Sequence, residues 1–92
     1  MNADAVGEEP QLTSDQVRAA RALLQWDQKK LAEKSNVSLA TIKRLEPVPG
    51  PIKANRVTVA ALKHCLQEAG VEFINMNGRG VGVRLRVPRE AE

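Results

Sequence analysis

Four short segments of the sequence share one arrangement, in which an apolar residue, a capping residue and three further residues precede a second apolar residue. A Ser, Thr or Asp side chain at the second position can accept a hydrogen bond from a backbone N–H of the first helical turn. The two apolar residues then have the spacing of a hydrophobic staple. Repeated helix starts of this kind predict a mainly α-helical domain built from short helices. The segments are LTSDQV (12–17), WDQKKL (26–31), VSLATI (37–42) and VTVAAL (57–62), with Thr13, Asp27, Ser38 and Thr58 as capping residues.

Apolar residues recur at helical spacing after each start. Four helices are expected, over residues 14–25, 28–35, 39–46 and 59–69. Pro47 ends the third helix, and Gly70 is the expected left-handed residue after the fourth. The loop over 47–55 contains three prolines and is not expected to form regular structure. The residues expected to face the core are Val17, Ala20, Leu23, Leu24, Leu31, Ala32, Ile42, Leu45, Val59, Leu62, Cys65, Leu66 and Ala69.

After Gly70 the apolar residues change to the alternation that is typical of β-strands. VEFI (71–74) and VGVRLRV (81–87) flank the turn-rich NMNGRG, which predicts a β-hairpin over residues 71–87. A single hairpin is marginally stable in water, so its apolar row must pack on the helices or against a second chain. We interpret this row as a dimerisation element made of Val81, Val83, Leu85 and Val87.

Charge is distributed unevenly along the chain. Residues 1–11 contain three acidic residues and no cation, and we expect this acidic segment and residues 88–92 to be disordered or flexible tails. Between them, the helical domain over 12–70 and the hairpin hold most of the cations. Residues 12–89 contain all 14 Lys and Arg against six acidic residues, a net charge of +8. A segment this basic favours a polyanionic partner such as nucleic acid.

Composition argues against several other classes of protein. Cys65 is the only cysteine, so neither a disulfide nor a cysteine-based metal site can form within the chain. No apolar run approaches the roughly 20 residues of a membrane span, and the N-terminus lacks the layout of a signal peptide. A cytoplasmic protein without a membrane partner is therefore expected. The sequence shows no pairing of His with a carboxylate, no phosphate-binding glycine loop and no cluster of metal ligands, so we expect no enzyme activity, cofactor or metal.

The second and third expected helices are joined by a short turn and are too short to be stable alone. Asn36 suits the left-handed backbone of a sharp turn, and Ala32 is small enough for close approach, so the pair is interpreted as a helix-turn-helix. QKKLAEKSNVSLATIKRLE (28–46) resembles the helix-turn-helix of the Cro/phage-repressor-type (XRE) family of DNA-binding regulators, and TVAALKHCLQEAGVEF (58–73) resembles that family's following helix. The matching positions are Gln28, Leu31, Ala32, Asn36, Val37, Ser38, Ile42, Leu45 and Glu46. The resemblance implies a lambda-repressor-like domain of four helices, followed here by a C-terminal β-hairpin in place of the family's fifth helix.

The resemblance also implies that the third helix enters the major groove of DNA. If Ile42 and Leu45 face the core, Ala40 and Arg44 face outward. The small Ala40 lets the helix approach the bases, and its methyl group can contact that of thymine, while Arg44 can bind guanine through two hydrogen bonds. The expected base-reading residues are Ser38, Leu39, Ala40, Lys43 and Arg44, of which Ser38 and Leu39 are implied by the resemblance alone.

Cations at the start of the second helix predict contacts with the DNA backbone. Lys29 and Lys30 lie in its first turn, where the helix dipole disfavours positive charge by roughly 0.3–1 kcal/mol. A nearby phosphate would remove this penalty; the alternative is that both are ordinary solvated lysines. The expected phosphate-binding residues are Gln28, Lys29, Lys30, Lys53, Asn55 and Arg56.

These features predict a sequence-specific transcription regulator, a repressor that binds two half-sites as a homodimer. Its expected partners are double-stranded DNA and a second copy of itself, with a regulatory protein as a further candidate. The main alternative is an antitoxin or antiactivator that uses the same fold to bind a protein. An RNA-binding protein is a weaker alternative, because Trp26 and Phe73 are the only aromatic residues available for base stacking.

Overall fold

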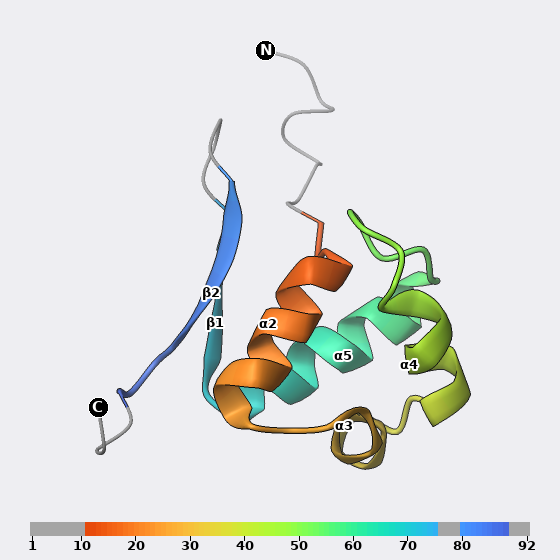
Figure 1. Cartoon of the computed structure of the whole chain (residues 1–92), viewed down its shortest axis with the longest axis horizontal. Coiled ribbons are helices and arrows are strands. Elements are labelled where there is room, and N and C mark those ends of the chain that lie inside the picture. Colours follow the sequence, from red (N-terminus) through yellow and green to blue (C-terminus); the bar gives the residue numbers. More distant parts are fainter. Residues whose placement is uncertain (1–10, 76–79, 89–92) are drawn as a thin grey trace.

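The computed structural model describes residues 11–75 and 80–88, and this part of the chain forms four helices and a two-stranded antiparallel hairpin (Figure 1). This layout confirms the expected mainly α-helical domain with a C-terminal hairpin. None of the described helices is long and apolar enough to cross a membrane. The tails predicted over 1–11 and 88–92 lie outside the described residues, except for Gln11 and Pro88. The elements are α2 (Ser14–Leu24), α3 (Gln28–Ser35), α4 (Leu39–Leu45), α5 (Arg56–Glu68), β1 (Val71–Asn75) and β2 (Val81–Leu85).

Three of the four predicted helix starts are confirmed. The side chains of Thr13, Asp27 and Ser38 each accept a hydrogen bond from a backbone N–H of the turn that follows. Thr13 also forms a capping box with Gln16, because its backbone N–H donates to Gln16 Oε1 at 3.0 Å while its hydroxyl accepts from the Gln16 N–H at 3.0 Å. Local sequence therefore determines where α2, α3 and α4 begin.

The prediction for the start of the last helix is wrong. α5 begins at Arg56, and its N-cap is Asn55, whose Oδ1 accepts a hydrogen bond of 2.8 Å from the Thr58 N–H. Val57 is 78% exposed, so it does not form the predicted staple with the buried Leu62. Asn is at least as good an N-cap as Thr, and capping at Asn55 lengthens the helix by most of a turn.

Two helices end in left-handed backbone. Gln25 follows α2 with a φ of 60°, and Asn36 follows α3 with a φ of 63°. Gly70, the residue expected to end the last helix, has a φ of 107° and lies just beyond the Ala69 C-cap of α5. α4 ends at Leu45, one residue before the expected end, and its C-cap Glu46 directly precedes Pro47. The expectations for Asn36, Pro47 and Gly70 are thus confirmed.

The core lies between the four helices and the hairpin. Leu31, Leu62 and Leu66 are almost fully buried at its centre. Its buried apolar members are Leu12, Val17, Ala20, Leu31, Val37, Ile42, Leu45, Ile52, Leu62, Cys65, Leu66 and Val71. Five residues expected to be buried are only partly buried, because they lie at helix ends or at the margin of the core: Leu23, Leu24, Ala32, Val59 and Ala69.

The hairpin packs on its own chain. β2 contacts α2 and β1 contacts α5, so the two strands form a layer on one side of these helices, and α3 and α4 lie toward the other side (Figure 1). Val83 and Leu85, two members of the predicted dimerisation row, are partly buried against the core. Val81 and Val87 remain 47% and 73% exposed. The hairpin therefore obtains from α2 and α5 the apolar contacts that an isolated hairpin lacks.

Gln16 connects the start of α2 to the hairpin. Its side chain is almost fully buried, and its Nε2 donates to Gly82 O at 3.0 Å and to Ile74 O at 3.5 Å. Ile74 and Gly82 lie opposite each other in the register of the hairpin. The same side chain thus completes the capping box and fixes the distance between α2 and the sheet.

Candidate nucleic-acid interface

The turn between α3 and α4 is held by short-range contacts. The N–H of the left-handed Asn36 donates to Ala32 O at 2.9 Å, and the Val37 N–H donates to Ser35 Oγ at 3.1 Å. Ser35 and Val37 are both 8% exposed. Because these residues are buried and hydrogen-bonded, the direction in which α4 leaves the turn is well determined.

α4 places one face in the core and the other in solvent. Ile42 and Leu45 are 1% and 4% exposed, whereas Ala40, Lys43 and Arg44 are all exposed. This orientation agrees with the one expected from the sequence, and base contact by the exposed residues stays a prediction. The outer face has a small residue followed, one turn later, by two cations.

The first turn of α4 presents hydroxyl groups rather than charge. Ser38 Oγ accepts a hydrogen bond of 3.1 Å from the Thr41 N–H and donates to Thr41 Oγ1 at 2.9 Å. Leu39 is half-buried, so only part of its side chain is accessible. Thr41 was not among the predicted residues, although a Thr three residues after a Ser cap is close enough for such a bond.

A buried polar cluster holds the C-terminal end of α4. Arg21 donates from Nε to Glu46 Oε2 at 2.8 Å and from Nη2 to Glu46 Oε1 at 2.7 Å, and the Glu46 side chain is only 4% exposed. Arg21 Nη1 also donates to Trp26 O at 3.1 Å. The hydrogen bonds to Glu46 raise the pKa of the Arg21 guanidinium. The cluster joins α2, the start of α3 and the end of α4.

Gln28 belongs to this cluster. It was predicted to contact phosphate, and in the structure its Nε2 donates to Glu46 Oε1 at 3.0 Å. Sequence reasoning missed Arg21 altogether, although an acidic residue that follows two inward-facing positions of a helix requires a cationic partner if it is buried. The structure shows a bracing role for Gln28, and its contact with phosphate stays a prediction.

The proline-rich loop after α4 is tied to the start of α2. The Ser14 N–H donates to Gly50 O at 2.9 Å, the Gly50 N–H donates to Asp15 Oδ2 at 3.2 Å, and the Ile52 N–H donates to Leu12 O at 3.0 Å. The hydrogen bond from Gly50, followed by the attraction of Arg18, lowers the pKa of Asp15. These bonds fix the route of the loop toward Lys53.

Arg18 closes the same junction from α2. Its guanidinium donates to the Glu46 backbone carbonyl and pairs with the Asp15 carboxylate. A cation at this carbonyl stabilises the C-terminal end of α4, where the helix dipole is negative. Arg18 therefore acts within the protein, and its charge is directed at the junction of α2, α4 and the loop.

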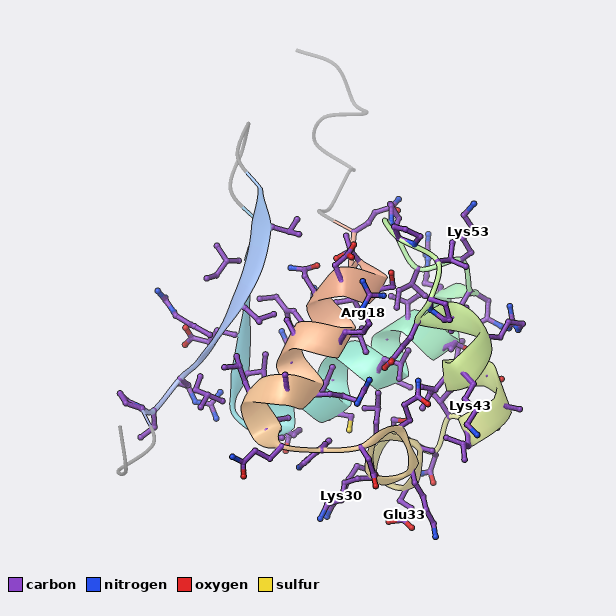
Figure 2. All side chains as sticks on the ribbon, in the orientation of Figure 1. Arg18, Lys30, Glu33, Lys43 and Lys53 are labelled. Carbon is purple, nitrogen blue, oxygen red and sulfur yellow. The ribbon has the colours of Figure 1, made fainter. Side chains whose placement is uncertain are left out.

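The other residues predicted to contact the DNA backbone lie at the starts of α3 and α5 and in the loop just before α5. Lys29 and Lys30 are exposed in the first turn of α3, while Lys53, Asn55 and Arg56 are grouped before and at the start of α5. Figure 2 shows Lys43 and Lys53 on the side of the molecule opposite the hairpin, and Lys30 projecting from the lower side of α3, apart from Lys53. The structure thus brings the Lys53 group to the same side as α4, with the α3 lysines at the margin of this surface.

The described residues include a thiol, a histidine and a surface hollow outside the set of predicted DNA contacts. Within them no group of three His, Cys, Asp or Glu side chains could hold a metal ion. Cys65 is a buried free thiol whose pKa is raised by burial. His64 lies 3.9 Å from Glu68, one turn later on α5, a pairing that sequence reasoning missed, but both side chains are about three-quarters exposed. An open hollow of about 670 Å³ lies between α3 and α5 and includes Trp26 and Lys34 in its lining.

Comparison of the chain with models of protein families, with curated proteins and with solved structures gave no match. The functional interpretation therefore depends on the residues and their arrangement.

Proposed function

We propose that the four helices form a lambda-repressor-like helix-turn-helix domain of the XRE type, and that the protein is a sequence-specific DNA-binding transcription regulator. In this proposal α3 and α4 form the helix-turn-helix, and α4 is the recognition helix that enters the major groove. The observation that carries the proposal is the division of α4: Ile42 and Leu45 are buried, while Ala40 and Arg44 are exposed one turn apart.

The exposed face of α4 suits the major groove because its two residues have different roles: Ala40 allows close approach, and Arg44 forms hydrogen bonds. A methyl side chain at Ala40 allows the helix to approach the base edges closely, and it can contact a thymine methyl group. Arg44 then has the reach to make two hydrogen bonds with guanine. Lys43 lies beside it and is available for a neighbouring base or phosphate.

Internal bracing supports the proposal as well. A residue that reads bases must be held in a defined position by packing and hydrogen bonds. α4 is held at its start by the buried turn residues Ser35 and Val37, and at its end by the cluster of Arg21, Gln28 and Glu46. A seven-residue helix is too short to stay helical in water on its own. The contacts at its two ends therefore keep α4 helical and in a fixed position.

Residues on both sides of α4 would contact the phosphate backbone of DNA. Lys29 and Lys30 at the start of α3, and Lys53 and Arg56 near the start of α5, are available for phosphates that flank the groove. Such contacts position a protein without reading sequence. We propose further that the protein is a homodimeric repressor whose half-sites are separated by about one turn of DNA or a multiple of it.

The proposal is tested by selecting bound sequences from random double-stranded DNA at physiological salt. We expect enrichment of an inverted repeat, and we expect Arg44→Ala to cost about 1–3 kcal/mol and to relax the preference at one base pair. Lys63→Ala, which removes a cation of α5 outside the predicted contact set, serves as the control and should keep both affinity and preference.

Two results would count against the proposal. An Arg44→Ala variant that selects the same sequences as the wild type would show that Arg44 does not read a base. Absence of any enrichment, with weak binding that does not change with salt concentration, would favour the alternative of an antitoxin or antiactivator, because DNA binding through phosphates is strongly salt-dependent.

A further inference from the structure

The outer edge of β2 is the most open backbone of the hairpin. Among the described hairpin residues the exposed ones belong to β2 and to the residues directly before and after it, and Val81 is 47% exposed. Figure 1 shows β2 nearer to the viewer than β1, with no other described segment in front of it. Exposed edges normally carry a Lys, a Pro or a bulge that prevents pairing with another chain. β2 has none of these, and its one charge, on Arg84, is paired with Glu72 at 2.7 Å.

The register of the hairpin determines which backbone groups face this edge. The Arg86 N–H donates to Gly70 O at 2.7 Å, and hydrogen-bonded pairs alternate with non-hydrogen-bonded pairs in an antiparallel ladder. The pairs that Val81, Val83 and Leu85 form with β1 are therefore the non-hydrogen-bonded ones. The N–H and C=O groups of these three residues point away from β1, toward the open edge.

We propose that this edge binds a second copy of the chain, with β2 antiparallel to β2 of the partner and Val83 at the centre. In this register Val81 lies opposite the partner's Leu85, and the two hairpins form one four-stranded sheet. All outward groups of the three residues are then paired, in about six hydrogen bonds. The apolar side chains that pack on α2 continue across the junction on the same face of the sheet.

Charge selects this register over its neighbour. With Val83 at the centre, Arg84 lies opposite the partner's Gly82, which has no side chain to obstruct it. With Arg84 at the centre, two arginines would lie directly opposite each other, and like charges in that position destabilise a sheet. The five residues of β2 also overlap completely only when Val83 is central.

The symmetry of the pairing fits the proposed function, on which this part of the inference rests. Identical antiparallel strands in one sheet are related by a two-fold axis perpendicular to the sheet. Because α4 lies on the far side of α2 and α5 from the hairpin (Figure 1), this axis directs both copies of α4 to the same side, where they can face one DNA duplex. α2 begins beside Gly82, which accepts a hydrogen bond from Gln16, and runs toward the C-terminal end of β2 (Figure 1), so the rotation directs the partner's α2 the opposite way along the sheet.

The test is oxidative cross-linking without DNA. Val83→Cys places one thiol on each side of the two-fold axis, with Cα atoms about 5.5 Å apart as in a hydrogen-bonded pair, within the range a disulfide spans. Arg84→Cys is the matched control on the same strand, because its side chain is directed at the partner's Gly82 and lies too far from its own copy. Wild-type protein controls for the buried Cys65. We expect Val83→Cys to shift to the mass of a dimer on a non-reducing gel, and Arg84→Cys and the wild type to stay at the mass of a monomer.

Sedimentation of the wild type provides a second measurement that does not depend on the variants. A dimer in free solution, together with cross-linking only at Val83, supports the inference. A wild type that sediments as a monomer both free and on DNA, or cross-linking of Arg84→Cys as fast as that of Val83→Cys, would overturn it. A monomer that still selects specific DNA would overturn the dimer and leave the proposed base reading by α4 intact, whereas a β2-linked dimer without DNA selection would refute the proposed DNA binding alone.

Discussion

Removing Arg21 should destabilise the protein far more than removing a comparable surface cation. The Arg21–Glu46 pair is bidentate, with N–O distances of 2.7 and 2.8 Å, and the side chains are 19% and 4% exposed. Breaking a buried ion pair by removing one partner costs roughly 3–5 kcal/mol, because the other charge is left buried and unpaired. Since Arg21 keeps some exposure, we expect Arg21→Met to cost about 3 kcal/mol, the lower end of that range.

The structure offers a control with the same chemistry at a different depth. Arg84 and Glu72 are also 2.7 Å apart, but their side chains are 69% and 38% exposed. An exposed pair of this kind contributes about 0–1 kcal/mol, so Arg84→Met should lower the free energy of unfolding only slightly. Burial is the main difference between the two pairs, and the second bond from Arg21 to Glu46 and its bond to Trp26 O act in the same direction.

The assay is urea unfolding followed by circular dichroism, with melting as a second measurement. A loss of 3 kcal/mol in a domain of this size corresponds to roughly 12–24 °C in Tm. The double variant Arg21→Met with Glu46→Leu should regain most of the loss, because well-packed apolar side chains often replace a buried ion pair at little cost. If Arg21→Met costs no more than Arg84→Met, or if the double variant is as unstable as the single one, the reasoning about burial is refuted.

Three further predictions follow from other contacts. Gln16→Leu should lower the free energy of unfolding by about 1–3 kcal/mol, because buried groups at the cap and in the hairpin lose their partner; Gln67→Leu, on the exposed face of α5, is the control in the same urea titration. The lowered pKa of Asp15 means that its hydrogen bond with Gly50 adds stability above pH 3.8, the ordinary value of the group, and that this contribution is lost as the pH falls below it. Asp15→Asn should therefore flatten the acid limb of a plot of Tm against pH, and an unchanged limb would show that Asp15 is not linked to folding. Lys29→Ala should weaken binding to all DNA sequences alike and reduce the slope of log affinity against log salt by about one, and a change in sequence preference would instead assign Lys29 to base reading.

Local sequence predicted the helix starts well because an N-cap acts over three residues. Thr13, Asp27 and Ser38 each bond within their own first turn, and no other part of the chain is needed. The failure at α5 has a local cause too: Asn55 and Thr58 are both suitable caps three residues apart. Choosing between them requires knowing where the proline-rich loop ends, and this loop is tied at Gly50 and Ile52 to residues distant in the chain.

The contacts that hold α4 in place could not be predicted in the same way. Arg21 and Glu46 are 25 positions apart, and Gln16 reaches the hairpin across 58 and 66 positions. Each of these side chains would also be unremarkable on a solvated helix. These side chains become buried and hydrogen-bond to one another only when the helices and the hairpin pack together. For this reason the sequence did not identify Arg21, and it predicted only a phosphate contact for Gln28.

The sequence by itself determined the order and ends of most elements and the outward face of α4, because caps, left-handed residues and apolar spacing act within a turn or two of the chain. Tertiary structure alone decided that the hairpin packs on α2 and α5, that the proline-rich loop is tied through its Gly50 to Asp15 of α2, and that Glu46 is buried with Arg21. These features depend on residues that are distant in the chain. Each buried polar group requires a hydrogen-bonding partner because the interior has a low dielectric constant, and no local sequence pattern identifies that partner.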